Sequence, residues 1–236
     1  MSIHTMEAGV HKMGEYISIF YERSEDITEA LLQHMLITGL SVLFACIVAI
    51  PIGIYLSKTS LEWIKSIVFT ITNIFQTIPS LAMLAIFIPL IGIGLKPAII
   101  ALFLYSLLPI LRNTYAAFDS IDEGIVESAT GMGYNVVQRL FQIEIPLALP
   151  YIMSGIRLTT VYIINWATLA ALIGAGGLGQ LIIGGMGVNN KPLILAAAIL
   201  AMVLALVVDF LFAKIENAFV KRSNPRQNSM IMEERT

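Results

Sequence analysis

Long apolar runs alternate with short polar segments along most of this chain. Five runs approach the roughly 20 apolar residues that a helix needs to cross a lipid bilayer. They cover approximately residues 31–56, 64–88, 97–111, 147–173 and 193–212. Because lipid offers no hydrogen-bond partners to backbone groups, each run is expected to be helical. The pattern therefore predicts an all-α polytopic membrane protein with about five transmembrane helices.

Several prolines lie within these runs, among them Pro51, Pro79 and Pro109. A proline inside a helix removes one backbone N–H, so the carbonyl four residues earlier loses its usual donor. Neighbouring helices can supply a replacement partner within a membrane. We therefore expect contacts from other helices wherever a proline lies inside a span.

The composition agrees with a membrane protein. Of the 236 residues, 57% are hydrophobic and 13% are charged, and the mean hydropathy is +0.83. Ordinary soluble domains carry about a quarter charged residues. The net charge of −2 provides no basic field for nucleic acid. Cys46 is the only cysteine, which excludes a disulfide within the chain, and the three histidines lack metal-ligand spacing, so no metal site is predicted.

The distribution of Lys and Arg predicts the orientation of the spans. With five spans and the N-terminus outside, ten of the 14 basic residues lie on the cytoplasmic side and four lie outside. Basic residues concentrate in cytoplasmic loops, which favours N-outside and C-inside. The chain then divides into an extracytoplasmic segment (1–29), a transmembrane domain (30–215) and a cytoplasmic tail (216–236). A short surface helix is expected at about residues 16–29.

A polar segment between the third and fourth spans carries the signals of a helical hairpin at residues 120–146. Ser120 and Glu123 have the spacing of a capping box that would start the first helix. Gly131 and Gly133 are suited to a left-handed C-cap that would close it. Asn135 and Gln138 repeat the same spacing and would cap the second helix. We expect two short helices lying roughly in the membrane plane on the cytoplasmic side, with Pro146 ending the hairpin before the fourth span.

An amphipathic hairpin of this kind can simply cover the membrane surface. The order Glu127-Ser128-Ala129, Gly133, Ile143-Glu144-Ile145-Pro146, however, resembles the EAA signature of ABC importer permeases. Ser128 replaces the second alanine and Ile145 replaces leucine. The resemblance implies a type I ABC importer permease of MetI-like fold, in which the hairpin docks on an ATPase subunit. The implied coupling residues are Glu127, Ala129, Gly133, Ile143 and Pro146.

Further segments resemble the permeases that import osmoprotectants. They are residues 76–82, 92–94, 107–115 and 172–179. This resemblance implies glycine betaine, carnitine, choline or proline betaine as substrates, and the bacterial plasma (inner) membrane as location. It also implies ABC ATPase subunits, a second permease copy or a paralogous permease, and an extracytoplasmic substrate-binding protein as partners, with no role for nucleic acid. A permease for methionine or ergothioneine remains an alternative, as does a motor-independent channel or secondary carrier.

The chain contains no P-loop motif, so we expect a transport subunit that is not an enzyme. No cofactor is expected in the chain itself, and ATP and Mg²⁺ would be bound by partner subunits. Gly174–Gly179 matches G-x-G-x-x-G but follows a membrane span, which argues against a dinucleotide site. A tight extracytoplasmic loop that continues through Gly184, Gly185 and Gly187 is expected instead, as a rim that meets the binding protein.

Polar residues inside spans are costly and often functional. The candidates for lining the pathway are Asn73, Gln76, Thr77, Tyr162, Asn165 and Trp166. Interhelical hydrogen bonding is the other open interpretation of these polar positions. The two aromatic residues would either contact a quaternary ammonium by cation–π interaction or pack in the core. Asp209, near the inner end of the fifth span, is expected to pair with a nearby Lys or Arg.

Overall fold

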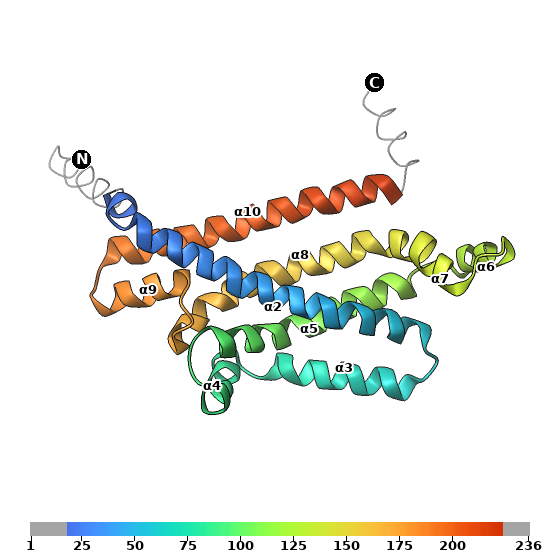
Figure 1. The fold of residues 1–236 in the computed structure, drawn as a ribbon, viewed down its shortest axis with the longest axis horizontal. Helices are drawn as coiled ribbons and strands as arrows, with labels where there is room; N and C mark the ends of the chain where they lie inside the picture. The colour runs from blue at the N-terminus through green and yellow to red at the C-terminus, as the bar shows by residue number, and fades with distance from the viewer. Residues whose placement is uncertain (1–17, 224–236) are drawn as a thin grey trace, which may run out of the picture. The chain divides into compact units, whose positions relative to one another are not determined.

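The computed structural model describes residues 18–223, and helices dominate it (Figure 1). No strand occurs among these residues, so the all-α prediction is confirmed. The elements in chain order are α2 (Ser24–Lys58), α3 (Glu62–Thr77), α4 (Ser80–Ile91), α5 (Leu95–Asp119), α6 (Glu123–Gly131), α7 (Val136–Arg139), the π-helical turn η1 (Leu140–Glu144), α8 (Ile145–Ala170), the 3₁₀ turn η2 (Ala171–Ile173), α9 (Leu178–Gly187) and α10 (Lys191–Ser223).

Four of the described helical segments are long and apolar enough to cross a membrane. They are α2, α5, the continuous segment Val136–Ile173, and Lys191–Val220 of α10. A fifth candidate is α3 with α4, which bend by 97° at Pro79. The prediction of about five spans is thus confirmed. The helices extend beyond the predicted apolar runs. For example, α5 continues to Asp119, whereas the predicted run ends at residue 111. Polar residues after Leu111 end the hydrophobic run. The helix continues through them because most of these residue types are tolerated inside a helix.

The N-terminal surface helix predicted at about residues 16–29 is broken at Arg23 in its described part, and its second half belongs to α2. Residues 18–22 are helical, Arg23 forms a turn, and α2 already begins at Ser24. The acidic residues Glu25 and Asp26 lie in the first turn of α2, where carboxylates interact favourably with the helix dipole. Residues 16 and 17 lie outside the described residues, as does the tail after Ser223.

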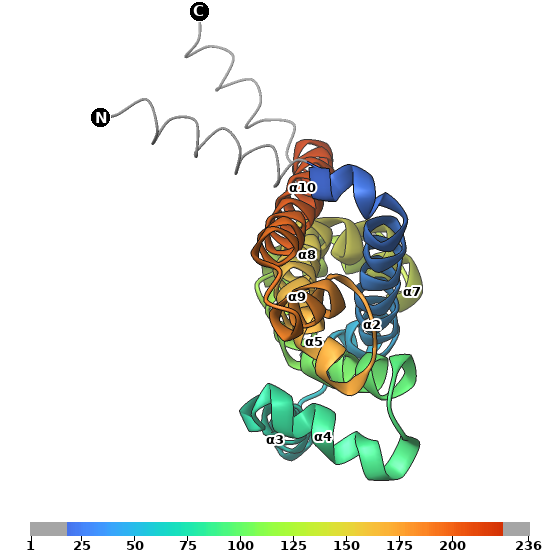
Figure 2. The ribbon, with the colours of Figure 1, turned by 90° about the vertical axis from the view of Figure 1, so that its left-hand side faces the viewer.

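Contacts divide the chain into two compact units, and α2, α5, α8 and α10 each contribute to both. The first unit comprises the described residues up to Ser41, then Ile78–Phe103 and Tyr162–Val207. Within it, α9 lies beside α8 and α10 (Figure 2). A Cβ added at Gly179 would collide with the Thr168 backbone of α8, so glycine is required for this close approach.

The glycine-rich segment therefore has a packing role in the first unit. Residues 174–177 form a loop in which Gly177 has φ +74° and donates its N–H to Gln33 Oε1 of α2, at 3.1 Å. The expectation that Gly184, Gly185 and Gly187 continue this loop is wrong, because all three lie in α9. Leu181 of the same helix packs against the buried residues Ile19, Leu193 and Ala196.

The second unit comprises Val42–Thr77, Leu104–Val161 and the described residues after Val207. Its core contains Ala117, Phe118, Ala148 and Ile152, which are all nearly inaccessible to solvent. Helix α3 lies along α5 (Figure 1), where the rings of Phe69 and Tyr115 meet edge to face at 5.4 Å.

A hydrogen bond from α3 compensates for the proline in α5. The Gln76 Nε2 amide donates to the Tyr105 carbonyl at 2.6 Å. In a regular helix this carbonyl would accept from residue 109, but Pro109 has no N–H. The expected support from a neighbouring helix is therefore confirmed at Pro109.

Candidate functional site

The first hairpin helix, α6, begins differently from the sequence prediction. Its N-cap is Asp122, whose carboxylate accepts a hydrogen bond from the Gly124 N–H at 2.8 Å. The predicted capping box of Ser120 and Glu123 is wrong, because the Ser120 hydroxyl instead donates to the Ala117 carbonyl. Aspartate caps helices as well as serine does, and Asp122 directly precedes the helix.

The corner of the hairpin is the predicted left-handed C-cap, and Gly133 provides it with φ +88°. The Gly133 N–H donates to the Thr130 carbonyl at 3.0 Å, and the Tyr134 N–H donates to the Ala129 carbonyl at 3.1 Å. This pair of bonds is the Schellman motif. An added Cβ at Gly133 would meet no atom within 4 Å. Glycine is therefore favoured here by the positive φ angle and not by a shortage of space.

The predicted cap of the second helix is confirmed in full. The Asn135 side chain accepts from the Gln138 N–H at 2.9 Å, and the Gln138 side chain accepts from the Asn135 N–H at 3.0 Å. This reciprocal arrangement satisfies two donors at the start of α7. Hydrogen bonds between residues that are three to five positions apart therefore stabilise the hairpin on both sides of its corner.

The second hairpin helix continues into the fourth span, so Pro146 does not end the hairpin. Residues Val136–Ile173 form one helical segment of 38 residues. Just before Pro146 the helix widens to the π turn η1, in which the Ile145 N–H donates to the Leu140 carbonyl. A proline ring crowds the carbonyl four residues earlier and offers it no donor. The wide turn accommodates the proline without breaking the helix.

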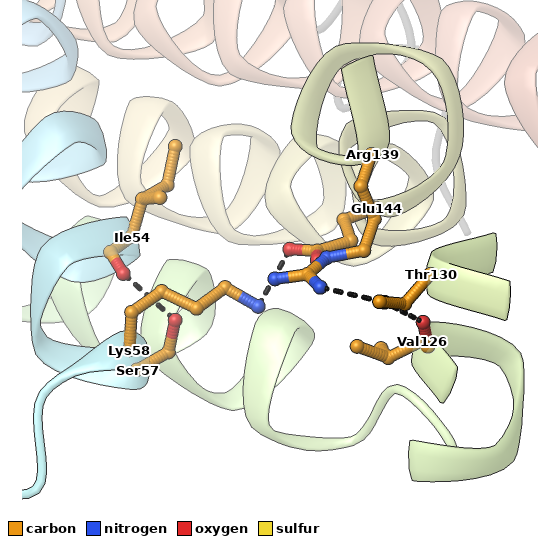
Figure 3. Close-up of polar contacts among 7 residues, drawn as sticks. All are labelled: Ile54, Ser57, Lys58, Val126, Thr130, Arg139 and Glu144. Atoms are coloured by element: carbon orange, nitrogen blue, oxygen red, sulfur yellow. Dashed lines mark hydrogen bonds and ion pairs between the residues drawn. The ribbon is translucent and has the colours of Figure 1, made fainter. Parts of the chain in front are cut away.

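The π turn places a buried carboxylate between two basic residues (Figure 3). Glu144 is 1% exposed, and its Oε1 accepts from Arg139 Nε at 2.8 Å. Its Oε2 lies 2.5 Å from Nζ of Lys58, the last residue of α2. Arg139 Nη1 also donates to the Thr130 hydroxyl of α6 at 3.0 Å. This network was not predicted from the sequence, although a lone acidic residue between Ile143 and Ile145 indicates a buried charge that requires partners.

The predicted coupling residues differ in exposure. Glu127 and Gly133 are exposed, and Glu127 makes no side-chain hydrogen bond or ion pair within the described part of the chain. Ala129 is 1% exposed, so it packs against its own chain. Ile143 and Pro146 line an apolar groove with Phe219 of α10. An apolar surface lies on and beside the corner, formed by Met132, Val136, Val137 and Phe141, each more than 60% exposed.

The polar candidates for the pathway fall into two groups, one in each unit. Asn73, Gln76 and Thr77 lie in the last two turns of α3, where the Thr77 hydroxyl donates to the Ile74 carbonyl. Tyr162 and Asn165 are exposed on α8, and Trp166 is half-buried. Each group lies within about one helical turn, and lining of a pathway stays a prediction for both.

The expected pairing of Asp209 is confirmed. Arg157 of α8 donates to both carboxylate oxygens of Asp209 in α10, at 2.6 and 2.8 Å. A third hydrogen bond of 3.2 Å joins Arg157 to Glu216 one to two turns further along α10. Two-pronged contacts of this kind are directional, so Arg157 fixes the register of α8 against α10 within the second unit.

The chain is similar in sequence to a family of known transport proteins. Residues 49–221 match the model of the family described as binding-protein-dependent transport system inner membrane component. The chain is 43% identical to the carnitine transport permease protein OpuCB of Listeria monocytogenes over 204 residues, which are 86% of this chain and 93% of that protein. It is 44% identical to the choline transport system permease protein OpuBB of Bacillus subtilis over 184 residues, covering 78% of this chain and 84% of the relative.

Solved structures show the same fold. A chain of the MetNI methionine ABC transporter in an inward-facing conformation superimposes with a TM-score of 0.76. The match covers 84% of this chain and 98% of the other, with 23% sequence identity. The predicted MetI-like fold is therefore confirmed.

Proposed function

Because the chain belongs to the family of binding-protein-dependent transport system inner membrane components, we propose that it is the permease subunit of an ABC importer for osmoprotectants. Glycine betaine, carnitine and choline are the expected substrates. Relatives more than 40% identical over most of the chain are named as carnitine and choline permeases, which supports this substrate class. Two permease subunits, either identical or paralogous, would form one pathway.

The observation that carries the motor-coupling part of this proposal is the exposed apolar surface at the hairpin corner. Met132, Val136, Val137 and Phe141 are exposed next to the unpaired Glu127. Clustered apolar side chains on a polar segment are typical of a protein interface. Glu127 is available to pair with a basic residue of the partner at the rim of such an interface. We infer that an ATPase subunit covers this surface and that it, not this chain, binds ATP and Mg²⁺.

The transport cycle then follows alternating access. ATP-driven closure of the two ATPase subunits moves both hairpins, and the spans open outward to receive substrate from an extracytoplasmic binding protein. Hydrolysis resets the permease. The hairpin lies in the cytoplasm of the bacterial cell in this arrangement, with the N-terminus outside, in agreement with the bias of Lys and Arg.

The test is uptake of radiolabelled glycine betaine, carnitine, choline and methionine in a strain that lacks other importers. The permease is expressed with its ATPase and binding protein, as wild type and as Glu127→Ala/Gly133→Trp. We expect osmolarity-dependent uptake of one or more of the three quaternary amines, and a loss of at least about tenfold in the variant, equivalent to about 1.4 kcal/mol. The ATPase should no longer copurify with the variant.

Gly187→Trp is the matched control, because Gly187 is also exposed, with open space around its Cβ, but lies in α9. It should retain the ATPase. Uptake of methionine alone by the wild type would reject the osmoprotectant assignment. Normal ATPase copurification with the double variant would reject the hairpin as the docking element, whatever the substrate is.

A further inference from the structure

The buried Glu144 network connects parts of the second unit that are distant in sequence. Its two basic partners come from the end of α2 and from the second hairpin helix. Through Arg139 the network reaches Thr130 in the first hairpin helix (Figure 3). Lys58 also lies over the ring of Phe118 in the core at the end of α5, with Nζ 5.6 Å from the ring centroid. One carboxylate thus joins both hairpin helices to the C-terminal end of α2.

The π turn makes this geometry possible. In an α-helix, side chains three and four positions apart are neighbours on one face, whereas those five apart are not. Arg139 and Glu144 are five apart, and the i→i+5 turn between them brings both onto the same face. Pro146 disfavours the regular α turn at this point. The orientation of the Glu144 side chain toward Lys58 therefore depends on the local widening of the helix.

The two connections of the hairpin to the spans are unequal. Its second helix continues into α8 through unbroken backbone. Its connection to α2 consists of side-chain contacts, in which Ile50 and Ile54 pack against the core near Leu140 and Lys58 pairs with Glu144. Apolar packing is non-directional. The Lys58–Glu144 ion pair instead joins two specific atoms, Nζ and Oε2, at 2.5 Å, and Glu144 is buried, so this attraction holds the end of α2 close to the hairpin.

We propose that Glu144 is a positioning residue that couples movement of the hairpin to α2 through Lys58. The inference rests on the proposed function, because the hairpin would be the part that the ATPase moves. Without the carboxylate, Lys58 and Arg139 face each other as like charges and the end of α2 separates from the hairpin. The motor can still dock, since Glu144 itself is buried and does not contribute to the exposed docking surface.

The first test measures geometry and needs no substrate. Spin labels are attached at Ser60→Cys and Met132→Cys, two exposed positions in the second unit, in a Cys46→Ala background. The full-length permease is studied in lipid nanodiscs, with labelled copies diluted by unlabelled ones. We expect Glu144→Gln and Lys58→Met to broaden the distance distribution between the labels. An unchanged distribution in both variants would overturn the proposal, even if the proposed transport function fails.

The second test measures coupling in the assembled transporter with the ATPase and the binding protein. The readout is the number of ATP molecules hydrolysed per glycine betaine imported into proteoliposomes. We expect this ratio to rise about fivefold or more in Glu144→Gln and Lys58→Met, while the ATPase still copurifies. The double variant should be no worse than the poorer single variant, because both remove the same connection.

Glu62→Gln is the matched control, since it removes the exposed Glu62–Lys65 ion pair on α3 and should leave the ratio unchanged. Equal losses of hydrolysis and transport in Glu144→Gln would show a general structural defect and overturn the coupling role. A wild-type complex that hydrolyses ATP but imports none of the osmoprotectants would reject the proposed substrate, while the distance measurement would still decide the role of Glu144.

Discussion

At the scale of single residues, Gln76 illustrates how one side chain supports an irregular helix. Its amide reaches the Tyr105 carbonyl at 2.6 Å, where the ring nitrogen of Pro109 cannot donate. Sequence analysis identified Gln76 as an intramembrane polar residue and left two roles open. The hydrogen bond demonstrates the interhelical role, because the amide joins α3 to α5. Pathway lining by the same residue stays a prediction.

Replacement of Gln76 by leucine should lower the free energy of unfolding by about 1 kcal/mol, the usual net contribution of one hydrogen bond, because this bond is partly buried. Thermal unfolding in detergent measures the effect. Pro109→Ala provides the control, because it restores the N–H of residue 109 as an internal donor for the Tyr105 carbonyl. In that background Gln76→Leu should cost less than half as much. An equal cost in both backgrounds would show that the amide does not compensate for the proline.

At the scale of elements, local signals were predicted well and distant partners were not. Asn135, Gln138 and Gly133 act through hydrogen bonds within five residues, so their spacing was sufficient to predict both caps. Ser120 has an equally suitable spacing for an N-cap, but the observed N-cap is Asp122, which directly precedes the first residue of α6. The choice between two good caps depends on where α5 ends, which the sequence pattern did not determine.

The π turn and the Lys58–Glu144 pair could not be predicted in the same way. A proline after a polar loop is compatible either with a chain break or with a widened helix, and packing against α2 and α5 decides between them. The residues of the pair are separated in sequence by α3, α4, α5, α6 and α7, and no periodicity relates them. Composition indicated that the Glu144 carboxylate requires partners, but only the fold identifies which ones.

The contact between α8 and α10 gives a prediction about element packing. Arg157→Leu removes the basic side chain that pairs with both Asp209 and Glu216, and it leaves both carboxylates without an ion-pair partner in the described structure. We expect it to lower the free energy of unfolding by about 1–3 kcal/mol, between the values for exposed and buried pairs. Asp209→Asn should cost less, because Arg157 keeps Glu216.

Thermal unfolding of the purified permease in detergent measures this order of stability. Lys214→Leu is the control, since it removes a nearby exposed basic residue of α10 that stacks on Phe210 without a carboxylate partner in the described chain. The triple variant Arg157→Leu/Asp209→Asn/Glu216→Gln should recover part of the stability lost in Arg157→Leu. A triple variant less stable than the single one would contradict the electrostatic explanation.

At the scale of the whole molecule, hydropathy was sufficient to predict the fold class and the number of spans, because a membrane permits few backbone arrangements. The 97° bend at Pro79 shows the limit of that argument. An apolar run of sufficient length was interpreted as one interrupted span, and the pattern contained no information on the angle at the interruption. The direction in which the spans cross the membrane rests on the charge bias alone.

Cysteine labelling of intact cells tests this orientation directly. In a Cys46→Ala background, single cysteines are introduced at Val188 between α9 and α10, at Ser60 between α2 and α3, and at Met132 in the hairpin corner, all exposed positions. With the N-terminus outside, a membrane-impermeant maleimide should label Val188→Cys in intact cells. Ser60→Cys and Met132→Cys should react only after permeabilisation. One crossing (α2) precedes Ser60 and three (α2, α3 with α4, and α5) precede Met132, so five spans place both on the cytoplasmic side with most of the basic residues. The reverse pattern would put the hairpin outside the cell, where no ATP-driven subunit could reach it, and would overturn orientation and motor coupling together.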